Sequence, residues 1–392
     1  MKRFASLLPL LLLLSVVLVL LPQIHIAHAQ LSTRVIVTIH ADGTISPEDA
    51  PVQRDGNIYT LKYGITGLKV ERNDTIIDGN RAYLAAYKGG GTVISLYNVR
   101  NVTVKNCVIG ESTVGIDVDS SSQITILNNR ITDADISMWW EAAAIRIKHE
   151  TSNIRIVGNT IENSKWGIFV YEESPNLVIH HNNFVQNSLQ DLYVVNRSLS
   201  SFSATWDDGR EGNYWNKYYG IDDDGDGIGD TPYSINENNQ DRCPLMEPIS
   251  FFDAGTWTWT QTRYFVYVVS NSQVSNFSFN PERTLVQFNV SGDNGATGFC
   301  RVTIPKELIY ADENDWTVLV DDNPVTPSVN EDADTTHLYF TYSHSSKTVE
   351  ILGTYAIPEF PSWLILPLFL MATLVGITAK KRLTQSVTRC TK

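Results

Sequence analysis

The sequence predicts an all-β protein in which a parallel β-helix is followed by a β-sandwich. Three observations lead to this prediction. A short apolar–polar alternation repeats through the middle of the chain, a second set of short strands follows it, and each end carries one uninterrupted apolar run. The chain has 392 residues and a formal net charge of −13, which argues against a nucleic-acid partner because phosphate binding requires a basic surface.

The N-terminal end, residues 1–29, is typical of a secretory signal peptide. Lys2 and Arg3 supply the charged start, and Leu7–Leu21 forms the apolar run. Ala27–Ala29 provides a small-x-small cleavage site. An uncleaved anchor helix is the alternative, but the apolar run is short for one. The bulk of the chain is therefore expected outside the cytoplasm.

The C-terminal end predicts a membrane anchor. Trp363–Ala379 is apolar and just long enough to cross the hydrocarbon core as a helix, and Lys380–Arg382 marks the cytoplasmic side. The residues that lead into it, Pro358–Ser362, resemble the PEF-type tail of archaeal cell-surface proteins. That resemblance implies a chain tethered by a transmembrane helix to the extracellular face of the membrane, or a sorting signal that a membrane transpeptidase removes.

Four copies of one strand pattern occupy the middle of the chain, beginning at Asn101, Gln123, Asn153 and Asn176. Apolar and polar residues alternate within each copy, and each copy has a second strand. A period of roughly 20 to 30 residues with two or three short strands is the signature of a parallel β-helix, whose stacked coils bury apolar columns. The columns are Val102/Ile124/Ile154/Leu177, Val104/Ile126/Ile156/Ile179 and Ile109/Ile131/Ile161/Phe184.

One column of the repeat is polar and contains Asn129, Asn159 and Asn182, with Cys107 at its head. Asparagine amides stacked at a turn can donate to and accept from the neighbouring coil. Cys107 in this column is expected to be a small buried residue rather than a reactive thiol.

The repeats, the leader Arg34–Leu61 and above all the closing segment Gly212–Tyr233 resemble the NosD-type right-handed parallel β-helix family, which overlaps the carbohydrate-binding and sugar-hydrolysis repeat group. The resemblance covers residues 57–250 and implies a right-handed helix. The family name also implies copper handling. We do not expect copper here, because Met is scarce and the adjacent His180 and His181 should point to opposite faces of a strand.

An acidic loop in the closing segment has the spacing of a calcium-binding loop. Aspartates fall at positions 1, 3, 5 and 9 of that pattern, and Gly227 at position 6 permits the sharp turn. Position 12 is Tyr233 instead of the bidentate Glu of an EF-hand, so the loop is closer to dockerin-like loops. A solvated acidic turn is the alternative. The predicted ligands of a structural calcium ion are Asp222, Asp224, Asp226, Ile228 and Asp230.

The outward positions of the second strands place acids, bases and aromatic residues in register on one face. Aromatic rings stack on sugar rings, while carboxylates and guanidinium groups bond sugar hydroxyls. Trp139 and Trp140, in an insertion between two copies, could overhang this face. The predicted glycan-binding residues are Asp117, Arg146, Lys148, Phe169, Tyr171, Tyr193, Trp139 and Trp140.

Three functions are compatible with this face. The favoured one is binding of extracellular polysaccharide or envelope glycan. The second is catalysis, either by a glycoside hydrolase that uses Asp117 and Asp119 or by a lyase that uses Arg146 or Lys148, and no sequence motif supports it. The third is a structural or adhesive envelope protein without a small-molecule site.

The chain after the repeats predicts an immunoglobulin-like β-sandwich, because seven short strands, most of them separated by turn residues, lie between Trp257 and Leu352. The first of these strands is expected over Trp257–Val269. Its expected role is to space the β-helix from the membrane. Five Asn-x-Ser/Thr triplets predict glycosylation, at Asn73, Asn101, Asn196, Asn276 and Asn289. The predicted divisions are the signal peptide 1–29, an N-terminal cap 30–56, the β-helix 57–250, the sandwich stalk 251–357, and the anchor with its basic tail 358–392.

Overall fold

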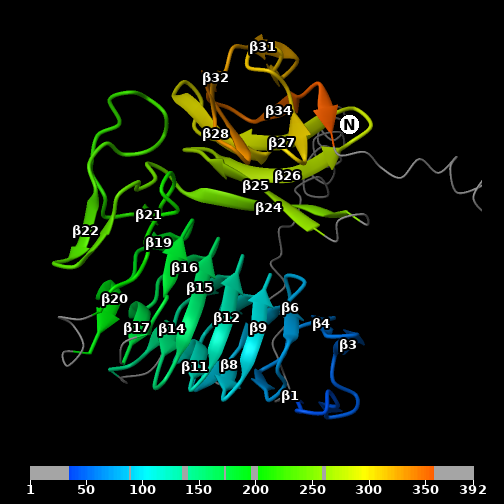
Figure 1. The fold of residues 1–392 in the computed structure, drawn as a ribbon, viewed down its shortest axis with the longest axis vertical. Coiled ribbons are helices and arrows are strands. Elements are labelled where there is room, and N and C mark those ends of the chain that lie inside the picture. Colours follow the sequence, from blue (N-terminus) through cyan, green and yellow to red (C-terminus); the bar gives the residue numbers. More distant parts are fainter. Residues whose placement is uncertain are drawn as a thin grey trace, which may run out of the picture.

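The computed structural model describes residues 35–87, 90–134, 140–171, 174–195, 202–257 and 262–356. The predicted signal peptide and membrane anchor lie outside these ranges. Within them there is no α-helix, and no helix that could span a membrane. Figure 1 shows two all-β bodies, a β-helix drawn in blue to green and a second body drawn in yellow to orange, with β24 (Ile249–Trp257) between them.

Three sheets form the β-helix, so each coil has three strands. The first sheet contains β1 (Ile36–Ile39), β2 (Ile45–Ser46), β5 (Gly67–Val70), β8 (Thr92–Tyr97), β11 (Val114–Asp119), β14 (Ala143–Ile147), β17 (Trp166–Val170) and β20 (Gln190–Val194). The second contains β3 (Val52–Asp55), β4 (Ile58–Leu61), β6 (Thr75–Asp78), β9 (Arg100–Lys105), β12 (Ser122–Leu127), β15 (Ser152–Val157) and β18 (Val178–His180). The third contains β7 (Tyr83–Ala85), β10 (Val108–Gly110), β13 (Arg130–Thr132), β16 (Thr160–Glu162), β19 (Asn183–Val185) and β21 (Tyr214–Trp215). The strands pair in parallel except for β2 with β1 and β3 with β4 at the N-terminal end.

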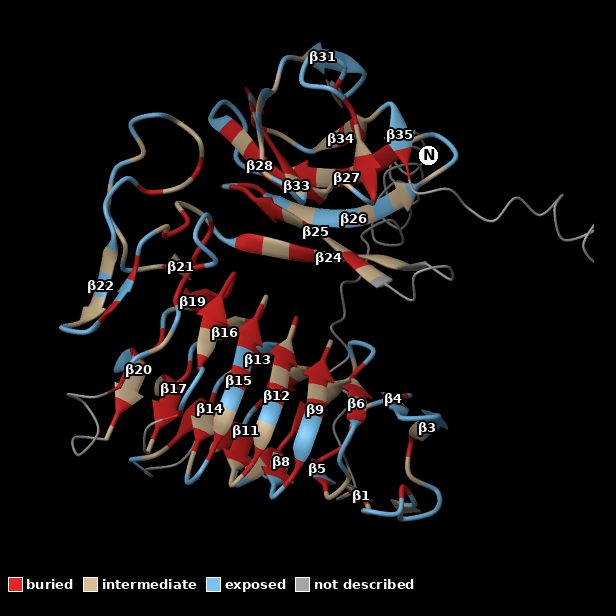
Figure 2. Cartoon of the chain, in the orientation of Figure 1, coloured by how far each residue is buried: buried red, intermediate tan, exposed pale blue. Residues whose placement is uncertain are grey.

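The predicted apolar columns form the core of the β-helix. Ile124 pairs with Val102 on one side and Ile154 on the other, and Ile131 pairs with Ile109 and Ile161. All of these side chains are fully buried. Figure 2 shows the alternation of buried and exposed residues along β9, β12 and β15. A coil alone would leave its column exposed to water, so stacking of the coils supplies the hydrophobic stabilisation.

A residue with left-handed backbone conformation turns the chain at the corner between the second and third sheets. Asparagine adopts this conformation more readily than most residues, and glycine adopts it without a Cβ penalty. The four corners are Asn106 (φ 55°), Asn128 (φ 52°), Gly158 (φ 68°) and His181 (φ 57°). The coil of β18 and β19 therefore holds a histidine where the three coils before it hold Asn or Gly.

The predicted asparagine ladder runs beside this corner. The backbone N–H of each member donates to the side-chain oxygen of the next, from Cys107 to Asn129 (2.9 Å), Asn129 to Asn159 (2.9 Å) and Asn159 to Asn182 (3.0 Å). Two further steps, to Asn213 (3.0 Å) and then Asp241 (2.7 Å), extend the ladder beyond the four predicted positions. Cys107 is buried, as expected.

The closing segment caps the apolar core. Trp215 stacks on Phe184 with ring centroids 4.4 Å apart, and Tyr233 of the hairpin β22 (Tyr233–Asn236) and β23 (Asn239–Asp241) stacks on the other side at 4.7 Å. The indole N–H of Trp215 donates to Asp241 at 2.9 Å. The end of the helix is therefore sealed by aromatic rings.

Two antiparallel sheets of five strands share the core of the second body, where seven strands were expected. The stretch Trp257–Val269 was predicted as one strand, which is wrong, because Trp257 ends β24 and a separate strand begins at Thr262. One sheet contains β24, β25 (Thr262–Val269), β28 (Thr297–Pro305), β32 (Ser328–Glu331) and β33 (Thr335–Ser343). The other contains β26 (Gln273–Asn280), β27 (Leu285–Ser291), β30 (Thr317–Val320), β31 (Asn323–Val325) and β34 (Lys347–Leu352), and the short pair β29 (Ile309–Tyr310) and β35 (Tyr355–Ala356) lies beside them.

Candidate functional site

The predicted outward residues lie in register on the first sheet, a surface that we call the ladder face. Asp117 of β11 pairs with Arg146 of β14, Arg146 pairs with Phe169 of β17, and Phe169 pairs with Tyr193 of β20. Parallel strands are about 4.8 Å apart, so these side chains form a continuous column across four coils. Trp139 lies outside the described residues.

The charged part of the ladder face is one connected ion-pair network. Arg146 makes two parallel contacts of 2.9 Å to the carboxylate of Asp117 and a third of 3.1 Å to Glu141. Lys148 contacts Asp117 at 3.2 Å and Asp119 at 3.0 Å. A bidentate guanidinium–carboxylate pair fixes both side chains in one plane. The network therefore presents polar groups in fixed positions.

Burial and charged or hydrogen-bonding neighbours together shift the pKa values of Arg146 and Tyr171. Burial alone would lower the pKa of Arg146, but the hydrogen bond with Asp117 and the charges of Asp117 and Glu141 outweigh burial and raise that pKa. For Tyr171, burial and a hydrogen bond with Glu141 both raise the pKa of the phenol. Both side chains consequently keep their neutral-pH charge over the whole physiological range.

An aromatic cluster continues the ladder face beyond Arg146. Phe169 is its centre, with Tyr193, Tyr171 and Trp140 at centroid distances of 5.0, 5.2 and 5.4 Å. Phe169 points outward from the β-helix but is completely covered by these rings, so it supports the surface instead of contacting solvent. Trp140 is 53% exposed.

Trp166 belongs to the same cluster and was missed by the sequence analysis. Its ring lies 4.4 Å from that of Tyr193, and its indole N–H donates to the carbonyl of Trp140 at 2.7 Å. Trp166 begins β17 three residues before Phe169, and strand alternation would turn it to the opposite face, so the sequence pattern did not indicate its place. The hydrogen bond holds the exposed Trp140 over the cluster.

The acidic loop brings together three of its five predicted ligands. Carboxylate oxygens of Asp222, Asp224 and Asp226 lie within 4.8 Å of one another. Both oxygens of Asp222 accept loop amides, from Gly225 at 2.8 Å and Gly227 at 2.9 Å. The remaining predicted carboxylate, Asp230, accepts the N–H of Asp223 at 2.6 Å, and the N–H of Ile228 donates to Asp226 at 2.9 Å.

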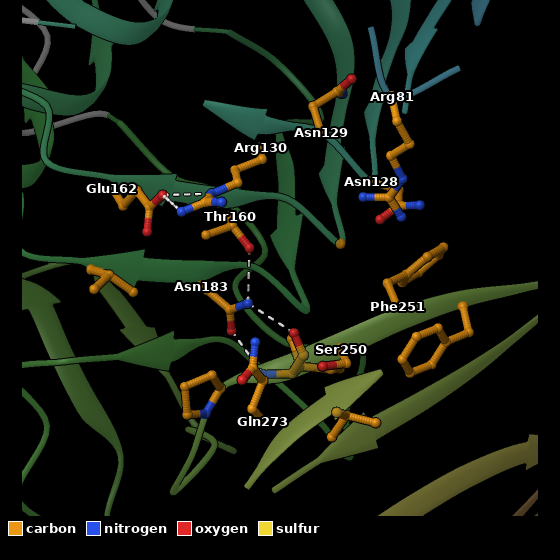
Figure 3. A pocket seen from close by; sticks show the side chains of 16 residues that line it. Arg81, Asn128, Asn129, Arg130, Thr160, Glu162, Asn183, Ser250, Phe251 and Gln273 are labelled. Carbon is orange, nitrogen blue, oxygen red and sulfur yellow. Dashed lines mark hydrogen bonds and ion pairs between the residues drawn. The ribbon is translucent and has the colours of Figure 1, made fainter. Parts of the chain in front are cut away.

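A polar cleft of about 540 Å³ separates the third sheet from β24 and β26, and the sequence analysis did not identify it. Arg130 contacts Glu162 at 2.6 Å on the β-helix side of the cleft. Figure 3 shows this pair, with Phe251 and Gln273 on the opposite side. Asn183 joins the two bodies, because its amide exchanges two hydrogen bonds of 2.8 Å with the backbone of Ile249. The repeats place Arg130, Thr160 and Asn183 at one position of the third sheet, so this polar column could be predicted. The strand that covers it, β24, could not be predicted from the repeats.

His180 and His181 lie side by side, so the expectation that they point to opposite faces is wrong. His181 is the left-handed corner residue, so strand alternation ends at His180, and the Nδ1 atoms of the two rings lie 2.7 Å apart. Burial and the neighbouring charge of His181 lower the pKa of His180 to about 4. His180 is therefore neutral at pH 7.

Glu211 connects these histidines to the sandwich. It is almost completely buried and contacts His181 at 3.0 Å, Arg301 at 2.9 Å and Thr303 at 2.8 Å. Burial opposes ionisation of Glu211, but hydrogen bonds with His181 and His337 and the charge of Arg301 hold its pKa well below the usual range.

Comparison with known proteins supports the class that the fold defines, a right-handed β-helix protein similar to NosD. A family model described as a right handed beta helix region matches residues 57–205. A probable ABC transporter binding protein NosD of Pseudomonas aeruginosa is 36% identical over 158 residues, which cover 38% of this chain and 35% of the relative. A protein of the same name from Stutzerimonas stutzeri is 37% identical over 93 residues, which cover 24% of this chain and 20% of the relative. The chain thus matches about a third or less of the length of these curated relatives.

Two solved structures also align with the chain over most of its length. One is the tailspike protein gp49 of Acinetobacter baumannii bacteriophage Fri1, a capsular polysaccharide depolymerase, at 11% identity over 75% of this chain and 64% of that one. The other is WceF of Pantoea stewartii, a glycan biofilm modifying enzyme, at 9% identity over 76% of this chain and 48% of that one. The TM-score is 0.12 in both cases, too low to carry an argument.

Proposed function

We propose that this chain is an extracellular, membrane-tethered protein that binds polysaccharide or envelope glycan through its ladder face. The observation that carries the proposal is the half-exposed Trp140, which lies above the aromatic cluster and beside the ion-pair network. Aromatic rings offer a broad apolar platform with a low entropy cost of ordering. Fixed carboxylate and guanidinium groups next to that platform can bond the hydroxyls of a sugar ring.

Binding agrees better with the geometry than glycoside hydrolysis does. The predicted carboxylate pair, Asp117 and Asp119, shares Lys148. Burial would raise the pKa of Asp119, but hydrogen bonds from Lys148 and Ser120 lower it. A glycosidase needs one carboxyl group that stays protonated until it donates to the leaving group. A carboxylate that is stabilised as an anion is poorly suited to that role.

The location and the stalk are parts of the same proposal. The signal peptide, the membrane helix and the immunoglobulin-like class of the sandwich rest on sequence patterns. The name shared by the two relatives, ABC transporter binding protein, supports an envelope location. In this arrangement the sandwich would hold the β-helix away from the membrane.

We also propose that the acidic loop binds one structural calcium ion. The convergence of Asp222, Asp224 and Asp226 supports this proposal, because alternate carboxylates on a tight loop suit a hard cation. The guanidinium of Arg301 in the sandwich donates to the backbone carbonyl of Asp226 at 3.1 Å, and this hydrogen bond connects the loop to the sandwich. An ion there would stabilise the junction of the two bodies.

The experiment for the glycan proposal incubates the full chain with neutral and acidic polysaccharides and measures retention and released products together by mass spectrometry. Retention without products is the expected result. Released products would instead make the protein an enzyme, and unsaturated or saturated ends would separate a lyase from a hydrolase. If the chain neither retains a polysaccharide nor releases products, a structural envelope protein is favoured.

A further inference from the structure

A group of metal-binding side chains lies where the end of the β-helix meets the sandwich, apart from the ladder face and the acidic loop. One nitrogen of His180, one nitrogen of His181 and one carboxylate oxygen of Asp208 lie within 4.8 Å of one another. The two histidines are buried, and Asp208 is partly exposed. Two imidazoles and one carboxylate form a ligand set that proteins use for divalent transition metals.

The carboxylate of Asp208 is oriented toward the histidines by the backbone. Its Oδ1 accepts the N–H groups of Arg210 at 3.0 Å and Glu211 at 2.8 Å. The other oxygen, Oδ2, faces His181 Nε2 at 3.8 Å. Such anchoring of one carboxylate oxygen is how metal ligands are commonly oriented by their surroundings.

The histidine rings are held with their nitrogen atoms close together. The 2.7 Å contact between Nδ1 of His180 and Nδ1 of His181 is a hydrogen bond in which one nitrogen carries the proton and the other accepts it, so a metal ion bound at these nitrogens would replace that proton. The ring of His181 is stacked on Tyr267 at a centroid distance of 4.9 Å and an angle of 13°. Its Nε2 lies 3.0 Å from Glu211, so two carboxylates face this nitrogen.

Solvent can reach these ligands through a cavity of about 390 Å³. The cavity is lined by both histidines and Asp208 from the β-helix side, and by Tyr267 and His337 from the sandwich. A polar cavity of this size accommodates water molecules that can complete a coordination sphere. Three protein ligands with an open position is the arrangement of metal centres that exchange a water or a substrate.

We infer that His180, His181 and Asp208 bind one divalent transition-metal ion of the Zn²⁺ class. Two ligand atoms about 2.1 Å from such an ion can be no more than about 4.2 Å apart. The 3.8 Å between His181 Nε2 and Asp208 Oδ2 already lies within that limit. The 2.7 Å between the two Nδ1 atoms would have to open if both bind the ion, because tetrahedral ligand atoms at this bond length are about 3.4 Å apart. Asp208 can adjust its position because its side chain is 41% exposed. Calcium and magnesium prefer oxygen ligands alone, so they are disfavoured here.

The test titrates Zn²⁺ into the full chain by calorimetry after chelation and in excess calcium, which occupies the acidic loop if that loop binds metal. We expect one Zn²⁺ per chain, and at least tenfold weaker binding in Asp208→Ala and His180→Ala. His149→Ala is the matched control, because His149 is an exposed histidine 3.4 Å from Asp119 on the ladder face, and it should bind like the parent. Circular dichroism checks that each variant is folded, and Asp208→Asn replaces any variant that is not.

Cobalt absorption supplies the second readout. Co²⁺ bound by imidazole and carboxylate gives ligand-field bands without a thiolate charge-transfer band. A thiolate band would place the ion at a cysteine instead and overturn the inference. Absence of Zn²⁺ uptake, or unchanged affinity in both ligand variants, would also overturn it and leave the histidines as hydrogen-bonded supports of Glu211.

Discussion

Arg301 of β28 donates to Glu211 of the β-helix across 2.9 Å, and neither side chain is more than 5% exposed. The pair joins the two bodies of the molecule far from bulk water. Removing one partner of a buried ion pair leaves an uncompensated charge, which typically costs about 3–5 kcal/mol. The junction is therefore a main determinant of how the β-helix and the sandwich hold together.

The first prediction concerns this pair. Arg301→Met should lower the free energy of unfolding by about 3–5 kcal/mol, measured by urea denaturation, because Glu211 loses its permanent positive partner. Arg130→Met is the control, since the Arg130 side chain is 56% exposed in its pair with Glu162 and should cost less than about 1 kcal/mol. If the two substitutions lower the free energy of unfolding equally, the buried pair does not stabilise the junction more than an exposed pair would.

The second prediction concerns the asparagine ladder. Asn159→Ala removes the acceptor of the buried Asn129 N–H and the amide that donates to the carbonyl of Ile126 at 2.8 Å. Each unsatisfied buried group costs about 1–3 kcal/mol, so thermal and urea unfolding should show a loss of several kcal/mol. Asn153→Ala is the control, because Asn153 is exposed and pairs with Asn176 at 2.9 Å; its left-handed backbone (φ 57°) limits the expected cost to about 1 kcal/mol. A similar loss in both variants would argue against the ladder.

The third prediction is a pH dependence at the end of the ladder. Burial raises the pKa of Asp241 to about 6, and hydrogen bonds from Trp215 and Asn213 only partly oppose this. The folded state then binds a proton that the unfolded state has released between pH 4 and pH 6, so stability should fall as pH rises through this window. The shift corresponds to about 3 kcal/mol.

Asp241→Asn checks this pH effect, because an amide does not titrate. The difference in unfolding free energy between parent and variant should change by about 3 kcal/mol from pH 4 to pH 7. A difference that is constant across this range would show that Asp241 does not titrate in it.

The fourth prediction concerns calcium. At a concentration about 100 times its dissociation constant, a bound ion adds about 2.7 kcal/mol of stability. Calcium should therefore raise the melting temperature of the parent and of Asp223→Ala, whose carboxylate lies outside the converging group, but not of Asp224→Ala. If chelation leaves the parent unchanged, the loop is a solvated acidic turn.

Much of the β-helix could be predicted from the sequence because its period is local. The inward columns, the asparagine ladder and the outward register of Asp117, Arg146 and Phe169 all follow from strand alternation and a fixed repeat. The burial of Phe169 did not follow, because it depends on how Trp140 and Trp166 fold over it.

The junction could not be predicted, for two physical reasons. The left-handed backbone of His181 ends the alternation of side chains that the prediction for His180 and His181 used. The identity of a histidine does not indicate that its backbone is left-handed. Glu211 is separated from Arg301 by 90 residues and from Thr303 by 92, so no local pattern indicates these contacts.

The measurement that tests the central claim most directly compares the affinity of Trp140→Ala with that of the parent for the polysaccharide that the parent retains best. Truncating an exposed aromatic anchor should weaken binding at least about tenfold. Tyr219→Ala is the control, because Tyr219 is 89% exposed and lies in the closing segment, away from the ladder face, and its affinity should equal that of the parent. Unchanged affinity in Trp140→Ala would contradict glycan binding by the ladder face.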